Sequence, residues 1–197
     1  QSIAAPAARF TVTAGPDGVF RVDRLAPDRY KVSATLGMPM RGMRFFSKDG
    51  EVPPGKETRV ELTVAQGTTS LVVVARPAAG EIGTGSVWLT TGTIAASTAQ
   101  EVALRLAGAG PGATSWKILM GESEVTFGEL VPGPYTACIV PLPSEIRGMQ
   151  AMEYAAANAD RLAAYCKTTQ VGAAGGRLEV PVTIPAVIPD EAPQGGS

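Results

Sequence analysis

The most restrictive feature of this 197-residue sequence is that it contains no histidine. Histidine is the usual general base near neutral pH and the commonest protein ligand of transition metals. Its absence excludes a serine-triad hydrolase, a papain-like thiol protease and most zinc sites. The sequence therefore predicts a protein that is not an enzyme and that carries neither a cofactor nor a resident metal.

The sequence also lacks an excess of charge and a long apolar run. Its 17 Lys and Arg residues nearly balance its 18 Asp and Glu residues, so it offers no field to attract nucleic acid. A helix that crosses a bilayer needs about 18 to 20 apolar residues. The longest candidate stretch, residues 136–142, is far shorter. We expect no nucleic-acid partner and no direct membrane span.

The composition favours many short strands. Apolar residues make up 45% of the chain, and 23 Gly and 16 Pro supply frequent turns. Segments with apolar residues at every second position predict strands over 9–13, 19–24, 29–35, 43–47, 57–65, 69–75, 85–91, 101–106, 115–119, 124–130, 134–140 and 177–184. The predicted fold class is all-β.

Helical spacing is confined to residues 145–165, which are rich in good helix formers. Met149 and Met152 recur at helical spacing, and Tyr154 lies in the same segment. An amphipathic helix at 144–165 is an element that a partner protein can bind through these three side chains. The alternative is that the helix covers the core of its own domain.

Two segments of the chain share one pattern. F-R-V-D-R-L-A-P-D-R-Y at 20–30 matches V-T-F-G-E-L-V-P-G-P-Y at 125–135, and V-E-L-T-V at 60–64 matches V-P-V-T-I at 180–184. We expect the leucine and the tyrosine ring of each copy to be buried, with the tyrosine hydroxyl reaching a rim partner. The repeat predicts two tandem modules, 1–66 and 67–188, the second with a helical insertion at 144–165. The tail at 189–197 is predicted to be a linker or disordered.

These residues carry a resemblance to a known family. D-G-V-F-R-V at 17–22, followed by L-A-P-D-R-Y-K-V at 25–32, resembles the signature of carboxypeptidase regulatory-like domains. The resemblance implies Ig-like or transthyretin-like β-sandwiches, common as tandem arrays in exported bacterial envelope proteins. It implies a non-catalytic structural or protein-interaction module that is extracytoplasmic: periplasmic, on the cell surface or secreted. A protein partner in an envelope or surface assembly is expected.

The first copy departs from the family pattern because the two strands that usually precede the Asp-Gly turn are missing. The second copy has them at 69–75 and 85–91, whereas only eight residues precede Arg9. A chain that opens with Gln1 is expected to be an excerpt of a longer polypeptide, with these strands upstream. The alternative is a sheet with an open edge, which tends to recruit a strand.

Cys138 and Cys166 are the only cysteines. One follows the Pro-Gly-Pro-Tyr turn and the other ends the helical segment, so a disulfide forms if their strands are antiparallel neighbours. The resemblance to exported domains favours this disulfide. The alternative is two reduced, buried thiols in a cytosolic protein.

Two ligand sites are alternatives to protein binding. Met38, Met40 and Met43 bring together three thioethers, which Cu(I) prefers, but their structural role would be to fill gaps in a loop. Trp88 and Trp116 suit sugar stacking, although a strand tryptophan more often packs into a core. A carbohydrate-binding accessory domain is the stronger of these two alternatives.

Overall fold

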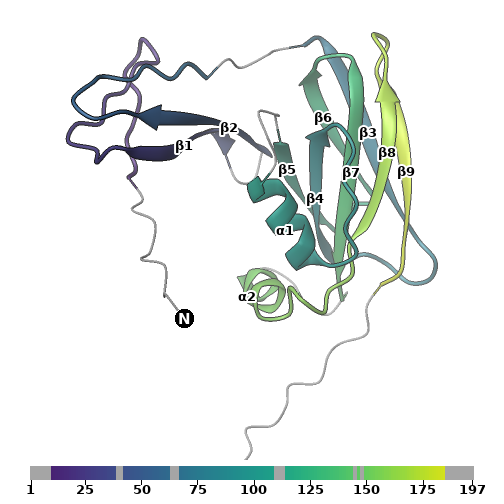
Figure 1. Cartoon of the computed structure of the whole chain (residues 1–197). Coiled ribbons are helices and arrows are strands. Elements are labelled where there is room, and N and C mark those ends of the chain that lie inside the picture. The colour runs from purple at the N-terminus through teal and green to yellow at the C-terminus, as the bar shows by residue number, and fades with distance from the viewer. Residues whose placement is uncertain are drawn as a thin grey trace, which may run out of the picture.

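The computed structural model describes residues 10–38, 42–62, 67–108, 114–143, 146 and 149–184 (Figure 1). They form two β-sheets and two helices, which confirms the predicted all-β class. The larger sheet contains, in spatial order, β1 (Asp28–Met38), β2 (Gly42–Val52), β5 (Thr114–Met120), β4 (Thr84–Thr91), β7 (Gly133–Leu142) and β8 (Tyr165–Val171). The smaller sheet contains β6 (Glu124–Leu130), β3 (Thr69–Pro77) and β9 (Gly176–Val182), in that order.

Residues 67–184, which we call the sandwich, place the smaller sheet against one face of the larger sheet (Figure 1). Because successive side chains of a strand point to opposite faces of the sheet, every second side chain lies between the two sheets, and these side chains are mostly apolar. The largest fully buried side chains of this inner core include Leu71, Leu89, Leu119, Ile139 and Val180. All pairs in the larger sheet are antiparallel, whereas β3 pairs antiparallel with β6 and parallel with β9.

The opposite face of the larger sheet is covered by α1 (Ala99–Gly108), by α2 (Met149–Ala157) and by the loop that leads into α1 (Figure 1). Beneath them lies a second apolar group, which we call the outer cluster. It consists of Val102, Cys138, Val140, Leu142, Leu162 and Ala164. The sandwich therefore has three layers: small sheet, large sheet and helices.

Residues 10–62, which we call the arm, contain the β1–β2 hairpin and extended segments on either side of it. Figure 1 shows the hairpin projecting away from the sandwich, with the start of β2 nearest to β5. The predicted strands at 29–35 and 43–47 lie within β1 and β2. The predictions at 9–13, 19–24 and 57–65 are wrong over the described residues, because none of these segments pairs with a strand through backbone hydrogen bonds. The described part of the arm is therefore not a complete sandwich, and the tandem-module interpretation stays a prediction.

Two further predictions are corrected. Residues 101–106 are not a strand but part of α1, because Val102 and Leu106, four residues apart, share one face of a helix. Leu104 lies on the other face and is 66% exposed. The helix predicted at 145–165 is shorter, since α2 ends at Ala157. The strand β8 begins at Tyr165, next to Cys166, where a further strand is expected. Within the part of the chain that the structure describes, neither helix has the length and apolar content needed to span a membrane. The tail at 189–197 lies outside the described residues.

Candidate functional site

Both copies of the repeated pattern close the same turn with a tyrosine. The Tyr30 hydroxyl donates a hydrogen bond to the Ala26 carbonyl at 2.8 Å, and the Tyr135 hydroxyl donates one to the Val131 carbonyl at 2.9 Å. In each copy the acceptor lies four residues before the tyrosine. The expectation that this hydroxyl reaches a partner at the rim is confirmed in both copies.

The backbone before the shared leucine is also the same in both copies. Arg24 has φ of 62° and Glu129 has φ of 56°. Among the described residues these are the only non-glycine residues with positive φ, a conformation that residues other than glycine rarely adopt. At Glu129 it coincides with a register shift in the pairing of β3 with β6, which indicates a β-bulge. The repeat therefore extends from sequence to backbone conformation.

The strands that follow the two turns, β1 and β7, have equivalent neighbours along one edge and differ along the other edge. β1 begins with Asp28 opposite Val52, the last residue of β2, and β7 begins with Gly133 opposite Val171, the last residue of β8. On its other side β7 pairs with β4. No strand of the described residues lies on the other side of β1, so β1 is an edge strand.

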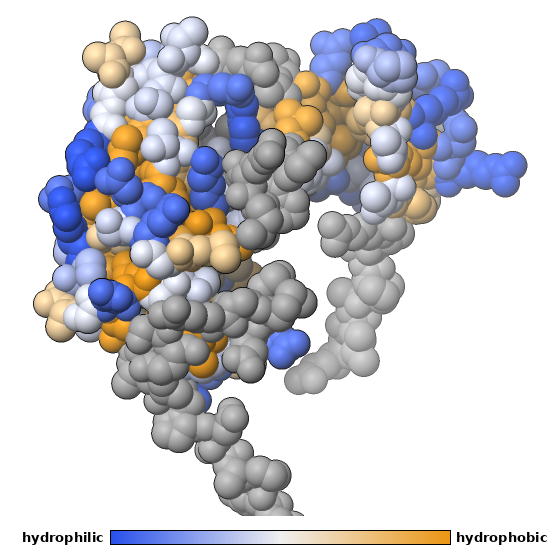
Figure 2. All heavy atoms as spheres, turned by 180° about the vertical axis from the view of Figure 1, so that it is seen from behind, coloured by the Kyte–Doolittle hydropathy of each residue, from blue (hydrophilic) through white to orange (hydrophobic). Residues whose placement is uncertain are grey.

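Burial separates the two copies. Leu130 and Tyr135 are each 6% exposed, which confirms the expected burial in the second copy. The equivalent Leu25 and Tyr30 are only half-buried. The arm also exposes five large apolar side chains, which are between 38% and 63% exposed: Phe10, Val12, Val19, Phe20 and Leu36. Figure 2 shows apolar side chains gathered on the arm, at the upper right of the view.

Two extended segments of the arm correspond to strands of the smaller sheet. Residues 19–25 correspond to β6 and residues 56–62 to β9, and in the sandwich β3 lies between these two strands. The arm has no central strand among its described residues. Residues 56–62 are instead held beside β2, where Thr58 Oγ1 donates to the Glu51 carbonyl at 2.8 Å and Lys48 Nζ donates to the Glu61 carbonyl at 3.2 Å. We use the name arm surface for the open edge of β1, the exposed side chain of Leu36 on that strand and the apolar side chains of residues 19–25.

The arm is joined to the sandwich by a short contact. Residues 43–45 of β2 pair with residues 114–116 of β5. The Arg44 guanidinium contacts the Glu129 carboxylate at 2.7 Å and lies 5.3 Å from the centre of the Phe46 ring. Arg44 thus connects β2 to the bulge at the end of β6.

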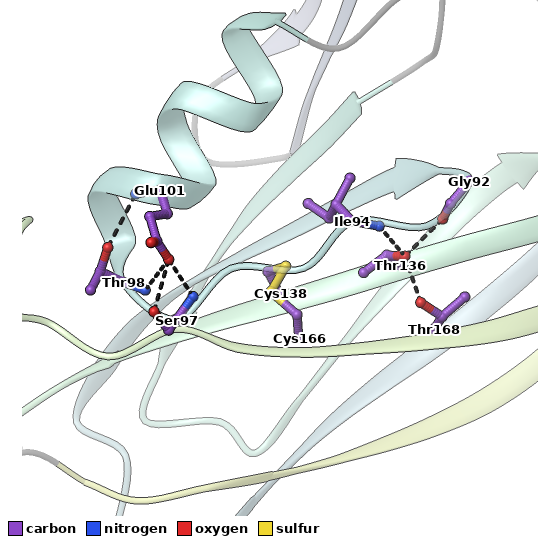
Figure 3. The surroundings of a disulfide bond; sticks show 9 residues. All are labelled: Gly92, Ile94, Ser97, Thr98, Glu101, Thr136, Cys138, Cys166 and Thr168. Carbon is purple, nitrogen blue, oxygen red and sulfur yellow. Dashed lines mark hydrogen bonds between the residues drawn. A yellow bond between two sulfur atoms is a disulfide. The ribbon is translucent and has the colours of Figure 1, made fainter.

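The sandwich is cross-linked directly beneath its helices. Cys138 of β7 and Cys166 of β8 lie opposite each other with 4.1 Å between their Cα atoms, and they form the predicted disulfide (Figure 3). Their neighbour Thr136 is fully buried, and its hydroxyl donates to the Gly92 carbonyl at 2.7 Å and lies 2.8 Å from Thr168 Oγ1. These bonds fix the loop that leads into α1.

The start of α1 has a reciprocal cap, which the alternation of apolar residues does not reveal. The Glu101 carboxylate accepts hydrogen bonds from the Ser97 and Thr98 backbone N–H groups at 2.7 and 3.3 Å, and the Glu101 N–H donates to Thr98 Oγ1 at 3.2 Å (Figure 3). The bonds from Ser97 lower the pKa of Glu101. The spacing Thr-x-x-Glu at 98–101 is the signature of such a capping box.

Only one of the three methionines proposed for copper has a described side chain. Met43 lies on β2 opposite Trp116, whereas Met40 and the side chain of Met38 lie outside the described residues. In the described ranges no three residues of the His, Cys, Asp and Glu types gather in a metal-binding group. The copper site stays a prediction.

The two tryptophans lie opposite each other on neighbouring strands. Trp88 of β4 and Trp116 of β5 have ring centroids 5.7 Å apart, and Phe45 of β2 is 6.3 Å from Trp88. Trp88 is half-buried and packs against the outer cluster, as the structural alternative requires. Trp116 Nε1 is buried without a hydrogen-bond partner.

Of the three side chains on α2 that are proposed to bind a partner, only one is described. Tyr154 is half-buried and packs against the outer cluster, in agreement with the alternative that the helix covers its own core. The side chains of Met149 and Met152 lie outside the described residues. The docking role of the helix stays a prediction.

Compared with models of protein families, with curated proteins and with solved structures, the chain matches none of them.

Proposed function

We propose that this chain is a non-catalytic structural or protein-interaction module of an extracytoplasmic assembly. We further propose that it contains two copies of a carboxypeptidase regulatory-like domain, the first of them incomplete. The observation that carries the proposal is the arm surface. Its edge strand and exposed apolar side chains, Phe20 and Leu36 among them, are attached to a cross-linked sandwich that buries the equivalent positions. Large exposed apolar areas on a soluble domain commonly mark an interaction surface.

Two properties of the chain support the other parts of the proposal. Disulfides persist in oxidising compartments and are rare in the cytosol, so the Cys138–Cys166 bond supports an extracytoplasmic location. The 197-residue sequence has no histidine, and this supports a role without acid–base chemistry near neutral pH. The hydrogen bond between Arg76 and Glu179 on the surface raises the pKa of Arg76 and lowers the pKa of Glu179, as structural ion pairs do.

Site-specific photo-crosslinking in the cells that produce the protein tests the interaction role. A photoreactive amino acid replaces Phe20 or Leu36 on the arm, and Leu104 or Met120 on the sandwich as matched controls, since all four are exposed apolar residues. The expected result is one adduct of fixed mass from both arm positions, suppressed by an excess of unlabelled chain. No adduct, or equal adducts from all four positions, contradicts the proposal.

Carbohydrate binding is the second candidate function, and one observation favours it. The buried Nε1–H of Trp116 is a hydrogen-bond donor without an acceptor, and the tilted ring of Trp88 lies 5.7 Å away. A sugar hydroxyl would supply an acceptor, and the ring faces suit a pyranose. A glycan array with the wild type and Trp116→Ala tests this candidate. Binding that is absent, or that is the same in both proteins, eliminates it.

A further inference from the structure

The sandwich shows which elements cover the apolar surfaces that the arm leaves open. β4 lies along the edge of β7 that is equivalent to the open edge of β1. β3 lies between β6 and β9, whose equivalents in the arm are the extended segments 19–25 and 56–62. The arm therefore lacks the equivalents of two strands among its described residues, one in each sheet.

The side chains of the arm are already arranged for such strands. Phe20 and Val22 take the positions of Val125 and Phe127, which β3 buries to 8% and 2% exposure. On β1, alternate residues are half-buried and face one side, as Tyr30, Val32 and Ala34 show. Phe20 remains 38% exposed. The apolar pattern is complete, and the described residues include no strand that covers it.

We propose that the arm binds two extended segments of a partner polypeptide, one antiparallel to β1 in the place of β4 and one between 19–25 and 56–62 in the place of β3. This inference rests on the proposed interaction function and specifies its partner. The partner segments alternate apolar and polar residues, as β3 and β4 do, so that backbone hydrogen bonds supply affinity and apolar side chains fill the arm.

The charges of the two copies specify one further residue of the partner. On β3, the Arg76 guanidinium contacts the Glu179 carboxylate of β9 at 2.7 Å. The match of 60–64 with 180–184 places Arg59 of the arm where the sandwich has Glu179. Arg59 is exposed and contacts only the neighbouring carboxylate of Glu61, at 3.0 Å, among the ion pairs of the described residues. A partner strand in the place of β3 therefore carries Asp or Glu where β3 carries Arg76.

A peptide with the sequence of residues 69–91 is a probe of this inference, because it contains both β3 and β4. Three labelled versions, each fused to a soluble carrier, are titrated against the full chain: the natural sequence, Arg76→Glu and a scrambled sequence. We expect saturable binding of the first two with Kd of about 10 µM or lower, and none of the scrambled peptide. The Arg76→Glu peptide binds about fivefold more tightly, because it pairs with Arg59 where the natural sequence repels it.

Two variants of the full chain locate the binding. Phe20→Asp weakens binding of the peptide by about tenfold or more, whereas Met120→Asp, at an exposed apolar position of the sandwich, leaves it unchanged. Both positions are exposed, so neither variant is expected to unfold the protein. Hydrogen exchange of the β1 amides slows when the natural peptide binds.

Several results would overturn the inference: no saturable binding, equal binding of all three peptides, or slowed exchange only outside β1, residues 19–25 and residues 56–62. A concentration-dependent dimer that protects β1 without peptide would overturn it as well, because a second copy would then be the occupant. If the peptides fail while Phe20 and Leu36 still give the discrete crosslink, binding by strand addition is wrong and the interaction function stands.

Discussion

The arm and the sandwich contain the same turn in two different environments. Tyr30 and Tyr135 make the same hydrogen bond, and Arg24 and Glu129 share positive φ, although only the second copy is buried. The turn is therefore encoded by local sequence. Residues 19–25 and β6 have similar patterns as well, but only β6 is a strand, because only β6 has β3 as a neighbour. Strand formation depends on the neighbour, whereas turn geometry does not.

Removal of the disulfide is expected to give the largest difference in stability change between the two regions. The bond links residues 28 positions apart, and the double variant Cys138→Ser/Cys166→Ser loses about 3.5 kcal/mol of the free energy of unfolding in the chain-entropy model. Urea unfolding measures this loss. Hydrogen exchange of the β1–β2 amides should not change, since the cross-link lies in the sandwich. A parallel loss of protection in the hairpin would show that the two regions unfold as one unit.

Truncating the shared leucine compares the two cores directly. Leu130 is 6% exposed, and Leu130→Ala is expected to lower the free energy of unfolding by about 3 kcal/mol. Leu25→Ala should cost less than about 1 kcal/mol, because Leu25 is only half-buried. Equal losses in thermal or urea unfolding would contradict the view that the first copy lacks its covering strands.

Removing the tyrosine hydroxyl gives a smaller difference of the same kind. Tyr135→Phe leaves the Val131 carbonyl without its partner and should cost about 1 kcal/mol, whereas Tyr30→Phe should cost a few tenths. Burial raises the pKa of Tyr135 above its ordinary value of 10.0. Its contribution to stability is therefore complete below pH 10 and is lost as the pH rises through the raised value. Unfolding measured at alkaline pH should show this loss in the wild type and not in Tyr135→Phe.

The smallest expected effect concerns the helix layer, which only the sandwich possesses. Hydrogen bonds from Ser97 and Thr98 lower the pKa of Glu101 below its ordinary value of 4.5. The bonded carboxylate stabilises the folded state above that value, and this contribution is lost as the pH falls through the lowered pKa. The wild type should melt slightly higher than Glu101→Gln at pH 7, and the two melting temperatures should converge as the pH falls through the lowered pKa. A constant difference across this range would contradict the role of the carboxylate.

The repeat and its turn were predictable because their determinants are local. Leu130, Pro132 and Tyr135 mark the turn in the sequence, and alternating apolar residues marked most strands of the sandwich. The disulfide was predictable once Cys138 and Cys166 were assigned to neighbouring strands.

The remaining elements depend on information that alternation does not contain. Alternating apolar residues fitted both a strand and α1, and only the cap at Thr98 and Glu101 distinguishes them. β8 has a weak pattern, and its pairing with β7 defines it. The pairing of β2 with β5 joins residues about 70 positions apart, and no short pattern predicts such a contact. The arm surface was foreseen only as an open edge, since its apolar exposure depends on which strands are present.

The narrow junction between arm and sandwich has a mechanical consequence. Among the described residues, three residue pairs, the contact of Arg44 with Glu129 and the ring contact of Phe45 with Trp88 connect β2 to the sandwich, while a disulfide and a three-layer core hold the sandwich itself together. A pulling force applied to anything bound on the arm will therefore separate β2 from β5 long before the sandwich yields. The protein would lengthen under load at this junction and shorten again when the load is released.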